Sequence, residues 1–489
     1  MWLNRCSLTT TMTSPISHPS HYPPTTMSKP TDIRIQHVET SLEHIDYRTP
    51  IKFGGRVVKD VTLFNVHVEV ETRDGRTGRG LGSTPVGNAW GWPSQQVEGE
   101  QTLEAMIELG ERIAQLLATY QDQAHPLEII HDLATDYQGI ADQVTAAASI
   151  AETMPRLAQL VAASPTDAAV HDALGKALGE NSYNLLGADF VNRDLGYYLG
   201  EDFSGSYLDE HTLRTPQPSM PLYHLVGALD PLTDGDLENR LDDGGPETLG
   251  EWICADGLTH LKIKLAGDDL GWDVARVVDI ERAAAEAQQS RGCQQWNYSL
   301  DFNEKCADVQ YVLDFLGQLN EQSAQALSRV QYIEQPTNRD LRSNPENTMH
   351  EAAKIKPVVI DESLVDLESL MLSRELGYSG VALKACKGHG EALMMGAAAR
   401  HFGLFLCVQD LTCVGASFLH SASIAARIPG IAAIEGNGRQ YCPLGNKGWD
   451  QHYPEMFELT DGTVGTGILT GPGLGYSPSA NRAEKGSDE

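Results

Sequence analysis

Residues 259–267 read THLKIKLAG, a short apolar run that carries two lysines. Similar runs occur seven more times between residues 221 and 437, with helical stretches between them, and several end in a charged residue. The others are PLYHLVGAL (221–229), NYSLDFN (297–303), VQYIEQP (330–336), KPVVIDES (356–363), GVALKACKG (380–388), LFLCVQDL (404–411) and GIAAIEGN (430–437). Eight short strands alternating with helices predict parallel βαβ units, and eight is the number of strands that closes a barrel.

An open, doubly wound sheet is the main alternative to the barrel. Such a sheet usually has a Gly-rich phosphate-binding turn after its first strand. Here the first strand is followed by DPLTDGDLENRLDDGG (230–245), which is acidic and unlike a phosphate cradle. The barrel is therefore the favoured fold.

A different pattern precedes the barrel. In VTLFNVHVEVE (61–71), apolar and polar residues alternate as in a strand with one buried face, and Asp74-Gly75 then signals a hairpin. Helical periodicity follows from Leu103 to about residue 163, and Ser164-Pro165 predicts a break. We expect an α+β capping domain over 31–165 and a barrel over 166–451. Segment 452–476 is predicted to pack on the cap, and 1–30 and 477–489 to be disordered tails.

Charge and composition exclude several classes of partner. The 489-residue chain has 36 Lys and Arg against 67 Asp and Glu, a formal charge of −31. This balance argues against nucleic acids and anionic membranes as partners. No apolar run approaches the ~18 residues needed to span a bilayer. The eight cysteines show no CxxC, and the first thirty residues lack the apolar core of a secretory signal, so we expect reduced thiols and a cytoplasmic protein.

Charged residues lie at or near the ends of consecutive predicted barrel strands, each about one strand and one helix from the next. They are Lys262, Lys264, Asp301, Glu334, Asp361, Lys384, Asp410 and Glu435. In a barrel, residues at the carboxyl ends of the strands converge on one mouth, where active sites of this architecture lie. We therefore expect these side chains to meet.

The three consecutive carboxylates, Asp301, Glu334 and Asp361, form a hard oxygen ligand set. Such a set suits Mg²⁺, ahead of Mn²⁺ or Ca²⁺. A single acidic residue at a strand end is usually a helix cap or a loop charge, but three in consecutive units are hard to explain in that way. Lys262 and Lys264 are two residues apart on one strand and should face the same way, opposite Lys384.

Several neighbouring residues have weaker signals. Asp410, Glu435 and Asn303 could either contact the substrate or support the residues that do. Lys387 is predicted to be a solvent-facing loop lysine, and Cys386 and His389 to be bystanders.

The ordered motifs LKIKL, SLDFNE, YIEQP, VVIDES and VALKACKGHG resemble the successive strand motifs of the enolase superfamily, in its mandelate racemase and muconate lactonizing enzyme group. AVHDALGKALGENSYNLLG (169–187) is similar to the helix that leads into the barrel in that group. YRTPIKFGGRV (47–57) and VHVEVETRDGRTGRG (66–80) resemble its capping domain. The resemblance covers most of residues 32–475.

This resemblance implies a (β/α)₇β barrel with an N-terminal α+β cap. It implies Mg²⁺ bound by Asp301, Glu334 and Asp361, and removal of the proton α to a substrate carboxylate to give a metal-stabilised enediolate. By position, Lys264 matches the acid/base lysine and Lys384 the lysine opposite it, while Lys262 matches the electrostatic helper of the KxK motif.

The departures from the family pattern favour one of its branches. The strand-six Asp and strand-seven His of the mandelate racemase branch are replaced by Lys384 and Asp410, which favours the muconate lactonizing branch, with lysines on both faces. The implied reactions are racemisation or epimerisation, cycloisomerisation, and elimination. The substrate would be a small-molecule carboxylate, and relatives commonly form homo-oligomers. Four residues of the cap loops, Lys52, Phe53, Trp90 and Trp92, are candidates for substrate selection.

Two rival functions remain open at this stage. A Schiff-base lyase on a similar barrel would use Lys384 or Lys264 as its amine nucleophile, but it leaves the three carboxylates unexplained. A non-catalytic barrel that keeps a metal site would need the carboxylates but not the opposed lysines.

Overall fold

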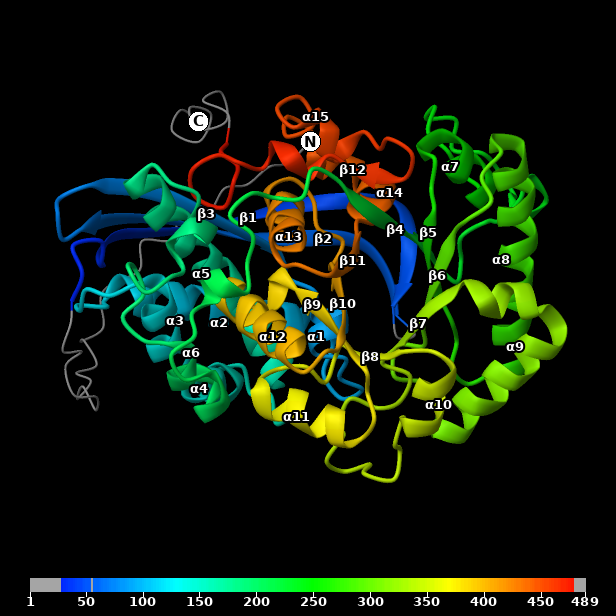
Figure 1. Ribbon diagram of the computed structural model, residues 1–489, viewed down its shortest axis with the longest axis horizontal. Helices are drawn as coiled ribbons and strands as arrows, with labels where there is room; N and C mark the ends of the chain where they lie inside the picture. The colour runs from blue at the N-terminus through cyan, green and yellow to red at the C-terminus, as the bar shows by residue number, and fades with distance from the viewer. Residues whose placement is uncertain (1–27, 54–55, 479–489) are drawn as a thin grey trace.

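The computed structural model describes residues 28–53 and 56–478, so the predicted tails lie almost entirely outside the described residues. The chain forms an antiparallel sheet with its own helices and a barrel beside it, with the cap helices α2–α4 at one end of the molecule and α8 and α9 at the other (Figure 1).

The cap begins with three antiparallel strands, β1 (Ile33–Phe53), β2 (Arg56–Thr72) and β3 (Thr77–Pro85). The alternation in β2 is as predicted, because Phe64, Val66, Val68 and Val70 are all buried. The cap helices are α1 (Asn88–Gly91), α2 (Gly99–Ala118), α3 (Pro126–Ala134), α4 (Tyr137–Ala147) and α5 (Arg156–Leu178). Side chains from α2–α5 form one apolar core with the buried face of β2.

The predicted break at Ser164-Pro165 is wrong, because α5 runs through both residues. Proline has no N–H, so the carbonyl of Val161 loses its helical donor at this point. The Ser164 hydroxyl donates a hydrogen bond to that carbonyl at 2.9 Å and lies 2.8 Å from the hydroxyl of Thr84 on β3. The serine before the proline thus supplies the missing bond, and the helix continues from the predicted cap into the predicted barrel region.

The barrel contains the eight predicted strands, all parallel and in sequence order. They are β4 (Met220–Val226), β5 (His260–Lys264), β6 (Asn297–Asp301), β7 (Val330–Glu334), β8 (Val358–Ile360), β9 (Gly380–Lys384), β10 (Phe405–Gln409) and β11 (Ile431–Glu435). Pairing of Ile434 with Leu222 and of Glu435 with Tyr223 joins β11 to β4 and closes the barrel.

One α-helix follows each strand from β4 to β10, which gives the (β/α)₇β order. These helices are α7 (Leu249–Asp256), α8 (Leu270–Arg291), α9 (Val309–Arg329), α10 (His350–Ile355), α11 (Leu367–Glu375), α12 (His389–His401) and α13 (Ala416–Arg427). The predicted fold, a barrel with an N-terminal α+β cap, is confirmed.

The remaining elements are short. They are α6 (Leu195–Leu199), α14 (Gly438–Tyr441), α15 (Pro454–Phe457), β12 (Thr463–Val464) and the 3₁₀ helices η1 (Ser182–Leu185), η2 (Glu201–Phe203), η3 (Leu208–Glu210), η4 (Asp234–Asp236), η5 (Ala385–Lys387), η6 (Pro443–Asn446) and η7 (Thr466–Ile468). Among the described residues, no helix is both long and apolar enough to cross a membrane.

Segment 452–476, which the sequence places on the capping domain, packs mainly on the barrel and also contacts cap helix α5, where Asp172 Oδ1 accepts the Leu474 N–H at 2.9 Å. Strand β12 pairs antiparallel with β4, and Met456, Leu469 and Tyr476 belong to the same apolar core as the barrel. Strand β4 leaves an open edge next to β12 at the amino end of the barrel, and this edge gives the segment backbone partners that the periodicity of the sequence does not reveal.

Candidate active site

Backbone register brings the predicted site residues together. In the parallel strands β5, β6 and β7, Lys264 is the direct partner of Asp301, and Asp301 is the direct partner of Glu334. On the other side of the barrel, Lys384 ends β9 beside Gln409 of β10, and Asp361 directly follows β8. Because the carboxyl ends of parallel strands face the same mouth, all these side chains point into one site.

Lys262 lies among carboxylates at the centre of this site and is almost completely buried. Its Nζ is 2.9 Å from Glu334, 3.0 Å from Glu435 and 3.2 Å from Asp301. The Nζ of Lys264 donates a hydrogen bond to the same Asp301 oxygen. The two lysines of β5 therefore face the same way, as predicted from their spacing.

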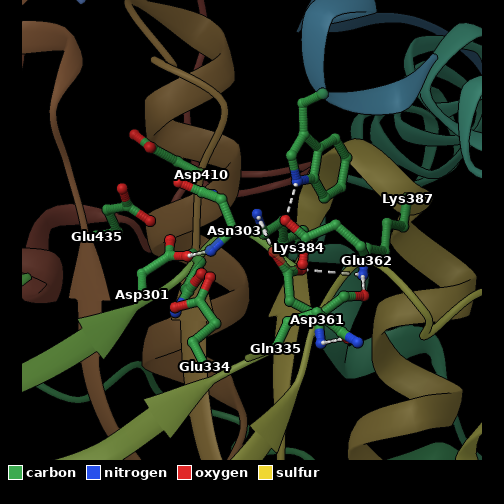
Figure 2. Close-up of polar contacts among 12 residues, drawn as sticks. Asp301, Asn303, Glu334, Gln335, Asp361, Glu362, Lys384, Lys387, Asp410 and Glu435 are labelled. Atoms are coloured by element: carbon green, nitrogen blue, oxygen red, sulfur yellow. Dashed lines mark hydrogen bonds and ion pairs between the residues drawn. The ribbon is translucent and has the colours of Figure 1, made fainter. Parts of the chain in front are cut away.

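A second group of cations surrounds Asp361. The Nζ of Lys384 lies 2.8 Å from Asp361 Oδ2. Lys387, from η5, donates to the Asp361 carbonyl at 2.5 Å and lies 3.2 Å from Asp361 Oδ1. The prediction that Lys387 faces solvent is wrong, since only 4% of it is exposed. In Figure 2, Lys384 and Lys387 lie on the Asp361 side of the site, whereas Asp410 and Glu435 lie on the Asp301 side.

Trp90 connects the cap to this second group. Its ring centre lies 4.1 Å from Lys384 Nζ and 5.5 Å from Lys387 Nζ, and its Nε1 donates to Glu362 Oε1 at 2.9 Å. Burial, and then the neighbouring charge of Asp361, raise the pKa of Glu362 to about 8. At neutral pH, Glu362 is therefore mainly a neutral acid.

The pKa values of the carboxyl groups in the site are shifted in opposite directions. Burial, followed by the charge of Asp301, raises the pKa of Glu334 well above its ordinary value. Burial also disfavours ionised Asp301 and Asp361, but lysine charges outweigh it and lower both pKa values, that of Asp361 to about 2. For Asp410, burial and then Glu435 raise the pKa. The site thus gathers more negative charge than its lysines balance.

The same carboxylates shift the pKa values of the lysines. Burial alone lowers the pKa of Lys262 and Lys384, but the surrounding carboxylates outweigh it and raise both pKa values above the ordinary value of lysine. In this arrangement, both side chains are ammonium ions that balance the acids.

The chemistry of the three predicted ligands fits a divalent cation. Asp301, Glu334 and Asp361 come from consecutive strands, are each about 1% exposed, and supply only carboxylate oxygens. Burial and then the charge of Asp301 raise the pKa of Glu334, and a divalent cation bound beside it would oppose both effects. Lysines pair with these oxygens, and no three His, Cys, Asp or Glu side chains in the described residues enclose a metal position.

The remaining predicted residues have different places. Asn303 donates its backbone N–H to Asp301 Oδ1 at 2.9 Å, from a backbone with φ of 47°. Lys52 is exposed on β1, and the side chain of Phe53 lies outside the description. Trp92 is not brought to the site, because it is buried in the cap core and donates to Glu152 at 2.8 Å.

A cavity opens between cap and barrel beside this cluster. Its cap walls include Tyr47, Val58 and Trp90, and its barrel wall consists of Leu411 and Thr412, which directly follow Asp410. The lining is mainly apolar and aromatic.

Three site residues were missed from the sequence, namely Lys387, Glu362 and Gln409. Gln409 accepts a hydrogen bond from Lys262 Nζ at 2.8 Å and donates one to Glu334. It ends its strand one residue before Asp410, as the charged residues do, so extending the strand-end search from charged to all polar residues would have found it.

Comparison with known proteins agrees with this geometry. Residues 247–482 match the family described as enolase C-terminal domain-like. No curated protein sequence matches the chain.

Solved structures of similar fold cover nearly the whole chain. The muconate lactonizing enzyme from Pseudomonas fluorescens, complexed with muconolactone, is 18% identical with a TM-score of 0.56, over 92% of this chain and 98% of that one. The L-Ala-D/L-Glu epimerase from Bacillus subtilis is 16% identical with a TM-score of 0.57, over 90% and 98%. A dipeptide epimerase from Enterococcus faecalis, complexed with Mg and L-Leu-L-Tyr, is 17% identical with a TM-score of 0.57, over 90% and 99%.

The match over residues 247–482 agrees with the family predicted from the strand motifs. The solved structures show that the chain shares their fold over nearly its whole length.

Proposed function

We propose that the chain is a Mg²⁺-dependent enzyme that removes the proton α to the carboxylate of a small-molecule substrate. The observation that carries this proposal is the placement of Lys264 and Lys384 on opposite sides of the three carboxylates. Lys264 pairs with Asp301 at one side, and Lys384 with Asp361 at the other.

Asp301, Glu334 and Asp361 are the residues that would hold the metal. When bound, Mg²⁺ would supply positive charge against the second negative charge that develops on the substrate carboxylate. Lys262 adds a fixed ammonium at the same place, since its Nζ lies within 3.2 Å of both Asp301 and Glu334.

Each of the two opposed lysines can hold the moving proton at its Nζ. If one removes the proton and the other returns it on the opposite face, the result is racemisation or epimerisation. If one removes the proton while a leaving group departs, the result is elimination or, in reverse, cycloisomerisation. A lysine serves as base only when neutral, so engagement of the carboxylate charges by a cation favours this role by lowering the ammonium's stabilisation.

The lining of the cavity between cap and barrel supports the proposal that the substrate has an apolar group next to its carboxylate. Its cap walls and Leu411 supply an apolar lining, and Trp90 lies between that lining and Lys384. The solved structures with muconolactone, a dipeptide and mandelic acid contain acids or their lactones and are consistent with this class.

The test measures exchange of the substrate α-proton in D₂O with Mg²⁺ present. Acid sugars, N-acylamino acids, dipeptides and lactones are offered, each as separate enantiomers where these exist. We expect exchange with at least one substrate. Lys264→Ala should abolish it for one enantiomer and Lys384→Ala for the other, because each lysine serves one face. Lys354→Ala, at an exposed lysine of α10, is the matched control.

Absence of exchange across the screen would favour the non-catalytic barrel. Borohydride trapping of a carbonyl substrate on either lysine, with activity that resists EDTA, would favour the Schiff-base lyase instead.

We also propose a cytoplasmic homo-oligomer. The seven cysteines within the described residues are all free, which suits a reducing compartment. Light scattering of the purified chain would test the oligomeric state.

A further inference from the structure

A second cavity lies where cap helices α3–α5 meet the start of α12. We call it the α5–α12 cavity. Lys387 forms part of its wall, and the same side chain donates to Asp361 in the candidate active site. Lys387 is thus shared by the cavity and the candidate active site, and the proposed reaction does not use the cavity.

Three polar side chains that line this cavity lack hydrogen-bond partners. They are the Tyr137 hydroxyl, Asp167 Oδ1 and His171 Nε2, on residues that are 2%, 3% and 1% exposed. Asp167 Oδ1 and His171 Nε2 are 3.5 Å apart and do not hydrogen-bond to each other. Burying unpartnered polar groups costs free energy, so three in one cavity indicate a polar occupant.

The charges of the cavity favour a cationic occupant. Asp167 and Glu391 both line it, and within the described residues neither forms an ion pair with a lysine or arginine. The Arg156 guanidinium lies over the Tyr137 ring, 5.5 Å from its centre, and Lys387 Nζ is engaged by Asp361. Burial raises the pKa of Asp167 and of Glu391 to about 7 each, and for Glu391 it outweighs the opposing charge of Arg156.

The neighbouring groups restrict what that cation can be. Burial lowers the pKa of His171 well below its ordinary value, so its ring is neutral and can accept a hydrogen bond. Leu127, Ile130, Leu160 and Met394 supply an apolar wall, which favours an organic cation with an alkyl part.

We propose that the α5–α12 cavity binds a small primary ammonium compound. Its N–H groups donate to Asp167 Oδ1, to the Glu391 carboxylate and to Tyr137 or His171, and its short alkyl chain packs on the apolar wall. One ammonium carries three N–H donors, enough for Asp167 Oδ1, the Glu391 carboxylate and one of the two remaining acceptors.

The test titrates n-propylammonium into the full-length protein by calorimetry at pH 8.5, where both carboxyls are ionised. Saturating Mg²⁺ is present so that the proposed metal site does not compete for the ammonium. We expect saturable binding of n-propylammonium and none of n-propanol, which has the same size but no charge. Asp167→Asn and Glu391→Gln should each weaken binding at least tenfold, and Glu351→Gln, at an exposed glutamate of α10, should leave it unchanged.

The two variants guard against a folding artefact. Asp167 Oδ2 accepts the Gly390 N–H at 2.9 Å, a bond that asparagine can also accept, while Glu391 forms no hydrogen bond or ion pair that its replacement would break within the described structure. If Asp167→Asn does not fold, Glu391→Gln decides. Absence of binding by the parent protein, or binding that both folded variants retain, would overturn the proposal.

Discussion

Trp90 joins the cap to the candidate site through two different contacts. Its ring faces Lys384 Nζ at 4.1 Å, and its indole N–H donates to Glu362. A cation over an indole ring is worth ~0.5–2 kcal/mol, and a hydrogen bond to a buried acid contributes a similar amount. This side chain therefore sets the position of Lys384 from the cap.

Two substitutions separate these contacts. Trp90→Phe keeps a ring but removes the N–H, and Trp90→Leu removes both. We measure kcat with a substrate that shows α-proton exchange in D₂O. We expect kcat to fall about fivefold for Trp90→Phe and about thirtyfold for Trp90→Leu, because each lost contact costs free energy and ~1.4 kcal/mol corresponds to a factor of ten. Equal losses in the two variants would mean that the ring does not act on Lys384. Trp92→Phe, in the cap core, controls for lost packing.

Asp167 provides a pH-dependent contribution to stability. Its pKa is about 7 in the folded chain against 3.8 ordinarily, so the folded state holds the proton more tightly. Below pH ~4 the group is protonated in both states and has no effect, whereas above pH ~7 the folded state carries a buried charge. The stability contribution therefore falls as pH rises from about 4 to 7, by up to about 4 kcal/mol.

Asp167→Asn removes this ionisation. We expect the Tm of the variant to rise relative to the parent as pH increases from 4 to 7, measured by calorimetric melting without ligands. Parallel curves for variant and parent across this window would contradict the assignment. The exposed pair Glu351 and Lys354 offers the control variant Glu351→Gln.

The site residues that could be predicted from the sequence are charged residues in otherwise apolar segments. Asp301, Glu334, Asp361 and the β5 lysines were recognisable because they end apolar strands. Lys387 was not, because it lies three residues beyond β9 in a 3₁₀ turn, where a lysine normally reaches solvent. Only the path of the chain after β9, which directs the side chain back to Asp361, decides its burial.

At the scale of elements, the close contact between β3 and α5 fixes the position of this helix against the cap sheet. The two elements approach so closely that a Cβ added at Gly80 would lie 2.0 Å from the Ala169 carbonyl, and one at Gly82 would lie 1.8 Å from the Pro165 carbonyl. These clashes involve backbone atoms, which cannot rotate away.

Gly80→Ala should therefore push α5 away from the sheet and cost about 3 kcal/mol of stability. Gly139→Ala is the matched control, since this exposed glycine of α4 has open space around its Cβ position, and we expect it to stabilise by ~0.5–1 kcal/mol. Chemical unfolding followed by fluorescence measures both. A Gly80→Ala variant as stable as Gly139→Ala would show that the elements can separate without cost.

The same helix shows where sequence patterns fail at this scale. Proline predicts a break from local backbone chemistry alone. The bond from Ser164 to the Val161 carbonyl, and the close packing on β3, are tertiary features that keep α5 continuous.

Across the whole molecule, the barrel was predictable because its pattern repeats eight times, so errors in single elements do not change the result. Segment 452–476 has no such repetition. Its position beside β4 depends on which strand edge the finished barrel leaves open, and that property belongs to the assembled fold.

The whole molecule also carries a formal charge of −31, and its most crowded acids meet in the candidate site. A cation that binds only the folded arrangement of Asp301, Glu334 and Asp361 stabilises the entire chain. At a Mg²⁺ concentration 100 times its dissociation constant, the gain is about 2.7 kcal/mol. We expect Mg²⁺ to raise Tm by several degrees over EDTA, and Asp301→Asn, Glu334→Gln and Asp361→Asn each to remove most of that increase.

This measurement needs no substrate, so it tests the metal site apart from the reaction. In EDTA, Asp301→Asn and Asp361→Asn lose ion pairs with buried lysines, so we expect both to melt below the parent. Glu334→Gln instead removes the carboxyl whose pKa is raised by burial and then by Asp301, so it should melt at least as high as the parent in EDTA. For Glu334→Gln, an undiminished Tm in EDTA with little response to Mg²⁺ distinguishes a lost ligand from a damaged fold. Variants that respond to Mg²⁺ as the parent does would place the cation elsewhere in this acidic chain, and Glu351→Gln shows the response expected from an unrelated acid.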